Sequence, residues 1–114
     1  MKNTVYEKSF AFATRIVNLK NFLQKDKKEY DISRQVLRSG TSIGANISEA
    51  QQAQSRADFV SKLNIALKEA QETDYWLRLL HNTGYLTDIQ FQSIISDCKE
   101  IEYLLISIVR SSKQ

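Results

Sequence analysis

The chain contains no proline and only three glycines among its 114 residues. Proline interrupts helices, and a fold of many short strands needs the frequent turns that proline and glycine supply. A chain with so few of either therefore favours a small number of long helices with short connections. Its 42% of hydrophobic and 25% of charged residues are ordinary for a globular protein, and its length suits one domain over residues 1–114.

Hydrophobic residues recur at steps of three and four along four segments of the chain. This spacing places them on one face of a helix, so we expect helices over about residues 5–25, 31–52, 56–83 and 88–111. In the last two segments the steps alternate as in a heptad repeat, which predicts left-handed crossings at about 20°. Long helices with short connections indicate an all-α, up-down-up-down left-handed four-helix bundle.

Several residues mark the expected ends of the third and fourth helices. Ser55 lies three residues before Asp58, and Thr87 lies three residues before Gln90, which is the spacing of side chains that cap a helix N-terminus. Gly84 is placed to end the third helix in a left-handed conformation. The Ser55 pair predicts where the third helix begins, and Gly84 with the Thr87 pair predicts the turn between the third and fourth helices.

Segment 35–49 is the one stretch that an ordinary amphipathic helix does not explain. Gly40 and Gly44 each cost up to about 1 kcal/mol relative to alanine within a helix, so they predict close approach of another helix; the alternative is a break in this helix. Asn46 and Glu49 are expected to face another helix, where a buried carboxylate needs a partner. We expect a structural polar network, with ligand binding or catalysis as the alternative. Its expected members are Gln35, Arg38, Ser42, Asn46, Glu49 and Glu72.

The formal net charge is +3 and the isoelectric point is about 9.0, which is mildly basic. Segment 20–38 contains three more basic than acidic residues and so carries the whole excess. Such a segment is a candidate for binding phosphates without reading bases. The sequence argument against this role is that the excess is small and that aromatic residues are not interleaved with the charges. The alternative is a solvated charged face that serves solubility. The candidate nucleic-acid contacts are Lys20, Lys25, Lys27, Lys28, Arg34 and Arg38.

Catalytic and metal-binding signatures are absent from the sequence. Cys98, the only cysteine, lies on the apolar stripe of its helix and is predicted to be a small buried hydrophobe rather than a nucleophile. His81, the only histidine, is predicted to supply a favourable charge near a helix C-terminus rather than to transfer protons. Metal sites in helical bundles need Glu-x-x-His pairs on two helices, and none occurs. We therefore expect no enzyme, no cofactor and no metal.

The surface pairs and the compartment follow from equally simple patterns. Asp74 precedes Arg78 by four residues, a spacing that predicts an ion pair on the exposed side of the third helix. A lone cysteine cannot form an intrachain disulfide, which indicates a reducing compartment. Charged residues interrupt any apolar run near the N-terminus, and no apolar run approaches about 18 residues. We expect a cytoplasmic protein that does not cross a membrane.

The pattern in segment 35–49 closely resembles the signature of a known family, the 23S rRNA intervening-sequence proteins. The matching residues are Gln35-x-x-Arg38-x-x-x-Ser42-Ile43-x-Ala45-Asn46-Ile47-x-Glu49, followed by Ser55, Arg56, Phe59, Leu63, Ile65, Ala66, Leu67 and Glu72. The resemblance covers essentially the whole chain. Two departures are Ala50, where the family usually has glycine, and Gly44, where it often has proline; they suggest a slightly altered middle and end of the second helix.

The resemblance implies a four-helix bundle that forms a homo-oligomer, expected to be a homopentamer. The family includes accessory variability proteins of diversity-generating retroelements, which use a basic surface to bind reverse transcriptase and RNA. Other members are encoded inside rRNA insertions and have no established activity. Two hypotheses follow. The first is a non-enzymatic oligomeric module that binds RNA or DNA, or assists a reverse transcriptase; the second is a protein–protein scaffold without nucleic-acid binding.

Overall fold

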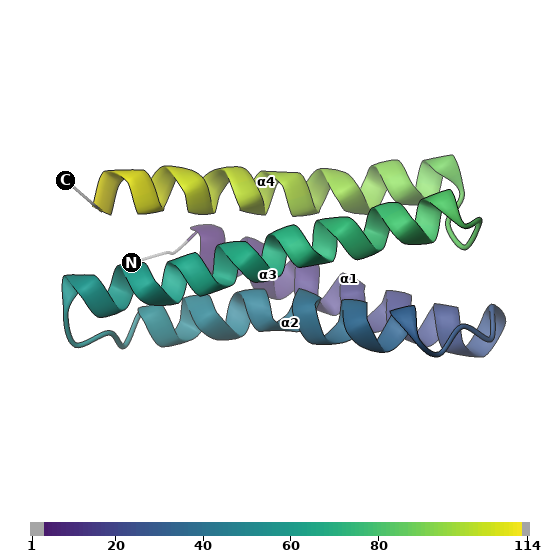
Figure 1. Cartoon of the computed structure of the whole chain (residues 1–114), viewed down its shortest axis with the longest axis horizontal. Coiled ribbons are helices and arrows are strands. Elements are labelled where there is room, and N and C mark those ends of the chain that lie inside the picture. The colour runs from purple at the N-terminus through teal and green to yellow at the C-terminus, as the bar shows by residue number, and fades with distance from the viewer. Residues whose placement is uncertain (1–3, 113–114) are drawn as a thin grey trace.

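The computed structural model describes residues 4–112, and its four helices form a rod of 44 × 22 × 20 Å (Figure 1). The helices are α1 (Thr4–Asp26), α2 (Ile32–Ala50), α3 (Arg56–Asn82) and α4 (Asp88–Ser112). Their ends differ from the expected ranges by at most two residues. Within residues 4–112 there is no strand, which confirms the all-α four-helix bundle.

Successive helices run in opposite directions along the rod, so each helix packs against the one before it (Figure 1). Helix α1 also lies beside α4, which closes the bundle, and this α1–α4 seam is the sparsest of the four. The turns α1–α2 and α3–α4 lie together at one end of the rod, and the α2–α3 turn lies at the other (Figure 1). No helix in residues 4–112 is long and apolar enough to cross a membrane.

One apolar stripe from each helix forms a continuous core. Ile16 of α1, Ile43 of α2, Leu77 of α3 and Leu105 of α4 have no exposed surface. Burying each of these side chains contributes about 1.5–3 kcal/mol relative to leaving it in water. The hydrophobic period therefore accounts for which face of each helix turns inward.

The two helical glycines bring α2 and α1 into close approach. A Cβ atom on Gly40 would lie 2.8 Å from both Cγ atoms of Ile16, and a Cβ atom on Gly44 would lie 3.1 Å from the Ser9 hydroxyl. Helix α2 continues unbroken through both positions. The predicted close approach is thus confirmed, and the alternative of a broken helix is wrong. On the α3 side of the same helix, the buried Thr73 hydroxyl donates a hydrogen bond to Ser39 (2.9 Å).

The predicted ends of α3 and α4 are confirmed by their hydrogen bonds. The Ser55 hydroxyl accepts from the Asp58 backbone N–H (3.0 Å). Thr87 and Gln90 cap α4 reciprocally, because each side chain accepts from the other residue's backbone N–H (2.9 and 3.1 Å). Gly84 follows α3 with φ +86°, the left-handed conformation that glycine adopts at low cost.

The start of α2 depends on Glu29, which lies in the connection between the first two expected helices. Glu29 is only 7% exposed, and its carboxylate accepts from the backbone N–H groups of Asp31, Ile32 and Ser33 at 2.7–3.1 Å. A left-handed residue, Lys28 (φ +56°), turns the chain so that Glu29 points back at the helix. A carboxylate at this position also interacts favourably with the positive end of the helix dipole.

Candidate functional site

Four of the six predicted nucleic-acid contacts lie at or beside the α1–α2 turn. We call Lys20, Lys25, Lys27 and Lys28 the basic turn. The last three are exposed, and Lys20 is half-buried. Among residues 4–112, none of the four has a carboxylate within ion-pair distance. Their ammonium groups are therefore open to an external anion, although Lys28 Nζ donates to the Lys25 carbonyl (2.9 Å) and Lys27 Nζ lies over the Phe22 ring (5.9 Å to the centroid).

The two predicted arginine contacts are placed differently, because each already binds an acidic side chain. Arg34 pairs with Asp31 (3.3 Å), the residue that directly precedes α2. Arg38 reaches across to α3, where it pairs with Glu69 (3.5 Å) and with Glu72. The structure therefore leaves the four lysines of the basic turn without acidic partners among residues 4–112, whereas part of the charge of the two arginines is neutralised.

Aromatic residues lie beside these lysines, which weakens the sequence argument that no aromatic residue is interleaved with the charges. Tyr30 stands between the basic turn and α2 and is 46% exposed. Trp76 of α3 borders a shallow hollow at the start of α2, which we call the aromatic hollow. It is lined by Asp31, Ile32, Arg34, Gln35 and Trp76. Sequence reasoning missed it because Trp76 comes from α3, some forty positions further along the chain.

The indole of Trp76 is fixed from two sides. Its Nε1–H donates to the Glu72 carboxylate (3.0 Å), and the neighbouring Tyr75 ring packs edge-on against it with centroids 5.1 Å apart. The bond from Trp76, assisted by Arg38, lowers the pKa of Glu72 and so keeps its carboxylate charged. Arg38, Glu72 and Trp76 thus form a connected polar chain between α2 and α3.

The other members of the expected polar network do not join this chain as a buried lock. Ser42 donates to the Arg38 carbonyl (2.6 Å), and the half-buried Asn46 donates to the Ser42 carbonyl (2.9 Å), so both bond within their own helix. Glu49 is exposed and pairs with Lys62 of α3 (3.0 Å), which overturns the expectation of a buried carboxylate. Gln35 is exposed and lies in the aromatic hollow.

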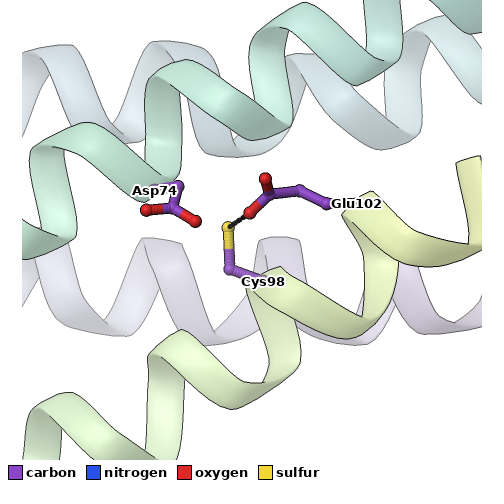
Figure 2. Close-up of side chains that lie close together, drawn as sticks. All are labelled: Asp74, Cys98 and Glu102. Atoms are coloured by element: carbon purple, nitrogen blue, oxygen red, sulfur yellow. Dashed lines mark hydrogen bonds between the residues drawn. The ribbon is translucent and has the colours of Figure 1, made fainter. Parts of the chain in front are cut away.

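A second cluster of ionisable groups lies between α3 and α4. Asp74 projects from α3 and converges on Cys98 and Glu102 of α4 (Figure 2). Their ligand atoms all lie within 4.8 Å of one another. Asp74 is 8% exposed and pairs with Arg78 (2.5 Å) and Lys99 (3.4 Å). The predicted pair with Arg78 is present, but Asp74 faces the interior rather than the exposed side.

The two carboxyl groups of this cluster share one proton. Burial would raise the pKa of Asp74, but the hydrogen bond with Glu102 and the cations of Arg78 and Lys99 lower it. Burial and the neighbouring Asp74 charge raise the pKa of Glu102 to about 7. Below about pH 7, Asp74 therefore carries the charge and Glu102 carries the proton.

The thiol of Cys98 is inert in this setting. Burial, followed by the nearby charges of Glu102 and Asp74, raises its pKa well above the usual range. It donates weak hydrogen bonds to the Ala70 carbonyl (3.4 Å) and to Glu102 (3.6 Å). A metal here would need the thiolate and would have to displace both cations from Asp74. The geometry fits a proton-sharing structural pair better than a metal site.

His81 connects the end of α3 to the start of α4. Its Nε2 lies 2.6 Å from the Asp88 carboxylate, and its ring stacks on Phe91 with centroids 4.2 Å apart. Asp88 therefore contacts the edge of the imidazole ring, and Phe91 covers one of its faces. The arrangement tethers the two helices at the end of the rod that also carries the basic turn (Figure 1).

Comparison with known proteins places these features in a family. The family model described as 23S rRNA-intervening sequence protein matches residues 1–107. A crystal structure from Bacteroides thetaiotaomicron VPI-5482, of a protein with unknown function from the S23 ribosomal protein family, superposes with a TM-score of 0.93. The two chains are 63% identical, and the match covers 95% of this chain and 96% of the other. No curated protein matches this sequence.

Proposed function

This chain belongs to the 23S rRNA-intervening sequence protein family, and from that premise we propose that it is a non-enzymatic, oligomeric module that binds nucleic acid through its basic turn. The observation that carries the proposal is the group of four lysines at the α1–α2 turn without carboxylate partners. Lysines of this kind neutralise phosphates and release the counterions condensed on a nucleic acid. The target in this proposal is RNA or DNA recognised by its backbone.

The proposed assembly is a homopentamer, as the resemblance of segment 35–49 implies. Its support in the fold is apolar surface that the bundle leaves uncovered. Phe10 and Val17 lie two turns apart on α1 and are 63% and 41% exposed, and Tyr103 of α4 is 70% exposed. A ring would contain one basic turn from each subunit, and together these turns would produce a strong local positive potential. A reverse transcriptase that holds RNA is a partner suited to such a ring.

The proposal of a non-enzymatic role rests on the state of the reactive groups. The Cys98 thiol is buried and held protonated, and His81 is bound by Asp88. The carboxylates of Glu102 and Asp74 oppose formation of the Cys98 thiolate, which is the form that attacks as a nucleophile. A lone buried thiol also fits the proposed cytoplasmic location, where thiols remain reduced.

Binding to polyanions over a salt series tests the proposal. We expect the affinity of the whole chain for structured RNA and duplex DNA to fall steeply with salt, and Lys27→Glu with Lys28→Glu to abolish most of it. The matched control is Lys68→Glu with Arg110→Glu, which changes the net charge equally at exposed positions outside the basic turn. Absence of binding at low salt, or equal loss in both double variants, contradicts the proposal.

A second candidate is a protein–protein scaffold without nucleic-acid binding, favoured by the same exposed residues Phe10, Val17 and Tyr103. Light scattering separates assembly from binding. A monomer at micromolar concentration argues against the oligomer, whereas an oligomer that ignores polyanions at low salt supports the scaffold. Replacement of Phe10 by Glu should dissociate subunits if the outer face of α1 is the contact.

A further inference from the structure

The aromatic hollow combines a fixed aromatic ring with polar groups on its rim. It has a volume of about 450 Å³ and opens on the surface between α2 and α3. Trp76 supplies the apolar wall, while Arg34 and Gln35 supply hydrogen-bonding groups. Hollows in which a few polar groups surround an aromatic surface bind small planar groups well. An indole already held by Glu72 and Tyr75 loses little conformational freedom when a ligand stacks on it.

The charges around the hollow indicate what kind of group fits. The carboxylate of Asp31 lies on the rim and engages Arg34, so the rim is close to neutral. A phosphate would be repelled by Asp31, but a neutral base would not. Phosphates find their cations a few residues earlier in the chain, at Lys27 and Lys28 of the basic turn. The aromatic hollow thus suits a nucleobase, and the neighbouring basic turn suits the phosphates of the nucleic-acid backbone.

From this juxtaposition we propose that the aromatic hollow binds an unpaired base of a single-stranded nucleic acid, whose phosphates lie on the basic turn. The proposal rests on the proposed function and narrows it from polyanions in general to single strands. Bases in a duplex are stacked on one another and cannot enter a side pocket, whereas unpaired bases stack on aromatic side chains. The exposed Tyr75 ring packs edge-on against Trp76 and offers an adjoining surface, and the exposed Tyr30 directly precedes Asp31 of the hollow in the chain.

Trp76 is the only tryptophan in the chain, so its fluorescence reports directly on the hollow. The whole chain is titrated with a uridine oligonucleotide, the same oligonucleotide as DNA, an RNA duplex and inorganic polyphosphate. We expect both single strands to quench the fluorescence, because base stacking quenches an indole. The duplex and polyphosphate should bind the basic turn without quenching.

Variants measured by anisotropy of a labelled oligonucleotide separate stacking from charge. Trp76→Leu should weaken single-strand binding by roughly fivefold to a hundredfold, the range of lost aromatic stacking. Its affinity for polyphosphate should stay within about twofold, and Trp76→Phe should retain most of the single-strand affinity. The control, Ile89→Ala, removes an exposed apolar side chain of α4 that lies outside the aromatic hollow and should leave single-strand affinity unchanged. Circular dichroism checks that each variant remains helical.

The outcomes distinguish this inference from the function on which it rests. One outcome is that single strands bind through the basic turn without quenching the fluorescence and without losing affinity in Trp76→Leu. That result contradicts base binding in the aromatic hollow and leaves the proposed polyanion binding intact. If no polyanion binds at low salt, both the base-binding hollow and the proposed nucleic-acid-binding function are contradicted. Fluorescence that changes on dilution without nucleic acid shows that a second copy of the chain covers Trp76, which also overturns the proposal.

Discussion

The two sides of α1 are closed in opposite ways. Toward α2, the glycines allow the backbones to approach, and Ile16 packs directly on Gly40. Toward α4, exposed ion pairs bridge a looser seam: Arg15 binds Asp97 (2.7 Å) and Ser93, and Lys8 binds Glu100 (3.2 Å).

The volumes between the helices show the same contrast. Hollows of about 450 Å³ and 160 Å³ open along the α1–α4 seam. Close packing forfeits contacts when it is disturbed, whereas exposed ion pairs contribute little because water competes for both partners. The first side should therefore carry most of the stability, and the second should be the side that opens.

Among these variants, Gly40→Leu should lower the free energy of unfolding the most. Its Cβ atom alone would overlap Ile16, and the longer side chain would force α1 away from α2. We expect a loss of about 3 kcal/mol in the free energy of unfolding, at the upper end of overpacking costs. Urea denaturation measures it. Ala45→Leu, on the exposed face of the same helix, is the matched control and should change stability little. Similar losses in both variants would refute the close-packing argument.

Glu102→Gln tests the seam between α3 and α4. This seam contains a buried polar pair, in contrast to the close glycine packing and the exposed ion pairs on the two sides of α1. Folding raises the pKa of Glu102 to about 7. Its contribution to stability is therefore complete below the unfolded pKa of about 4.3 and is lost as the pH rises through 7. Gln mimics the protonated acid, so the variant should exceed the wild type by about 1 kcal/mol at pH 8, after allowance for partial exposure.

Denaturation at pH 5 and pH 8 gives this difference, and Glu100→Gln is its control. Glu100 lies on the same helix but is exposed and paired with Lys8. Its replacement should leave the change in stability between the two pH values as in the wild type. If Glu102→Gln retains the full pH dependence of the wild type, the shared proton is not its source.

Arg15→Ala should have the smallest effect, below about 1 kcal/mol, because its ion pair with Asp97 is two-fifths exposed. Salt should reduce even this difference. Hydrogen exchange offers the sharper readout, since amides of α1 and α4 that face this seam should exchange faster in the variant. A loss as large as that of Gly40→Leu would show that the two sides of α1 are equivalent.

The bundle and its helix ends follow from patterns within single segments, which explains why they are predictable from sequence. The period of apolar residues orients each helix, and the glycines at 40 and 44 signal close approach because they are costly in a helix. Glu29 escapes such reasoning, because its capping role requires the left-handed turn at Lys28. A lysine gives little warning of that conformation.

The sites depend on the register between helices, which no single segment encodes. Trp76 reaches the start of α2, and Asp74 meets Glu102, only once the helices are aligned. The same limit explains the polar segment 35–49. Its pattern predicts a polar network with a buried Glu49, but Glu49 is exposed and its partner is Lys62 of α3, which pattern reasoning did not identify.

The capped turn before α2 separates architecture from surface charge. Glu29 anchors the backbone from inside, while the lysine heads of the basic turn take no part in that anchoring. Related proteins could therefore exchange these lysines for other polar residues and acquire a new partner without rebuilding the bundle. The side chains on the outer face of the turn can therefore change without changing its backbone. Because Lys28 has a positive φ, it is the position where glycine or asparagine would be accepted most readily.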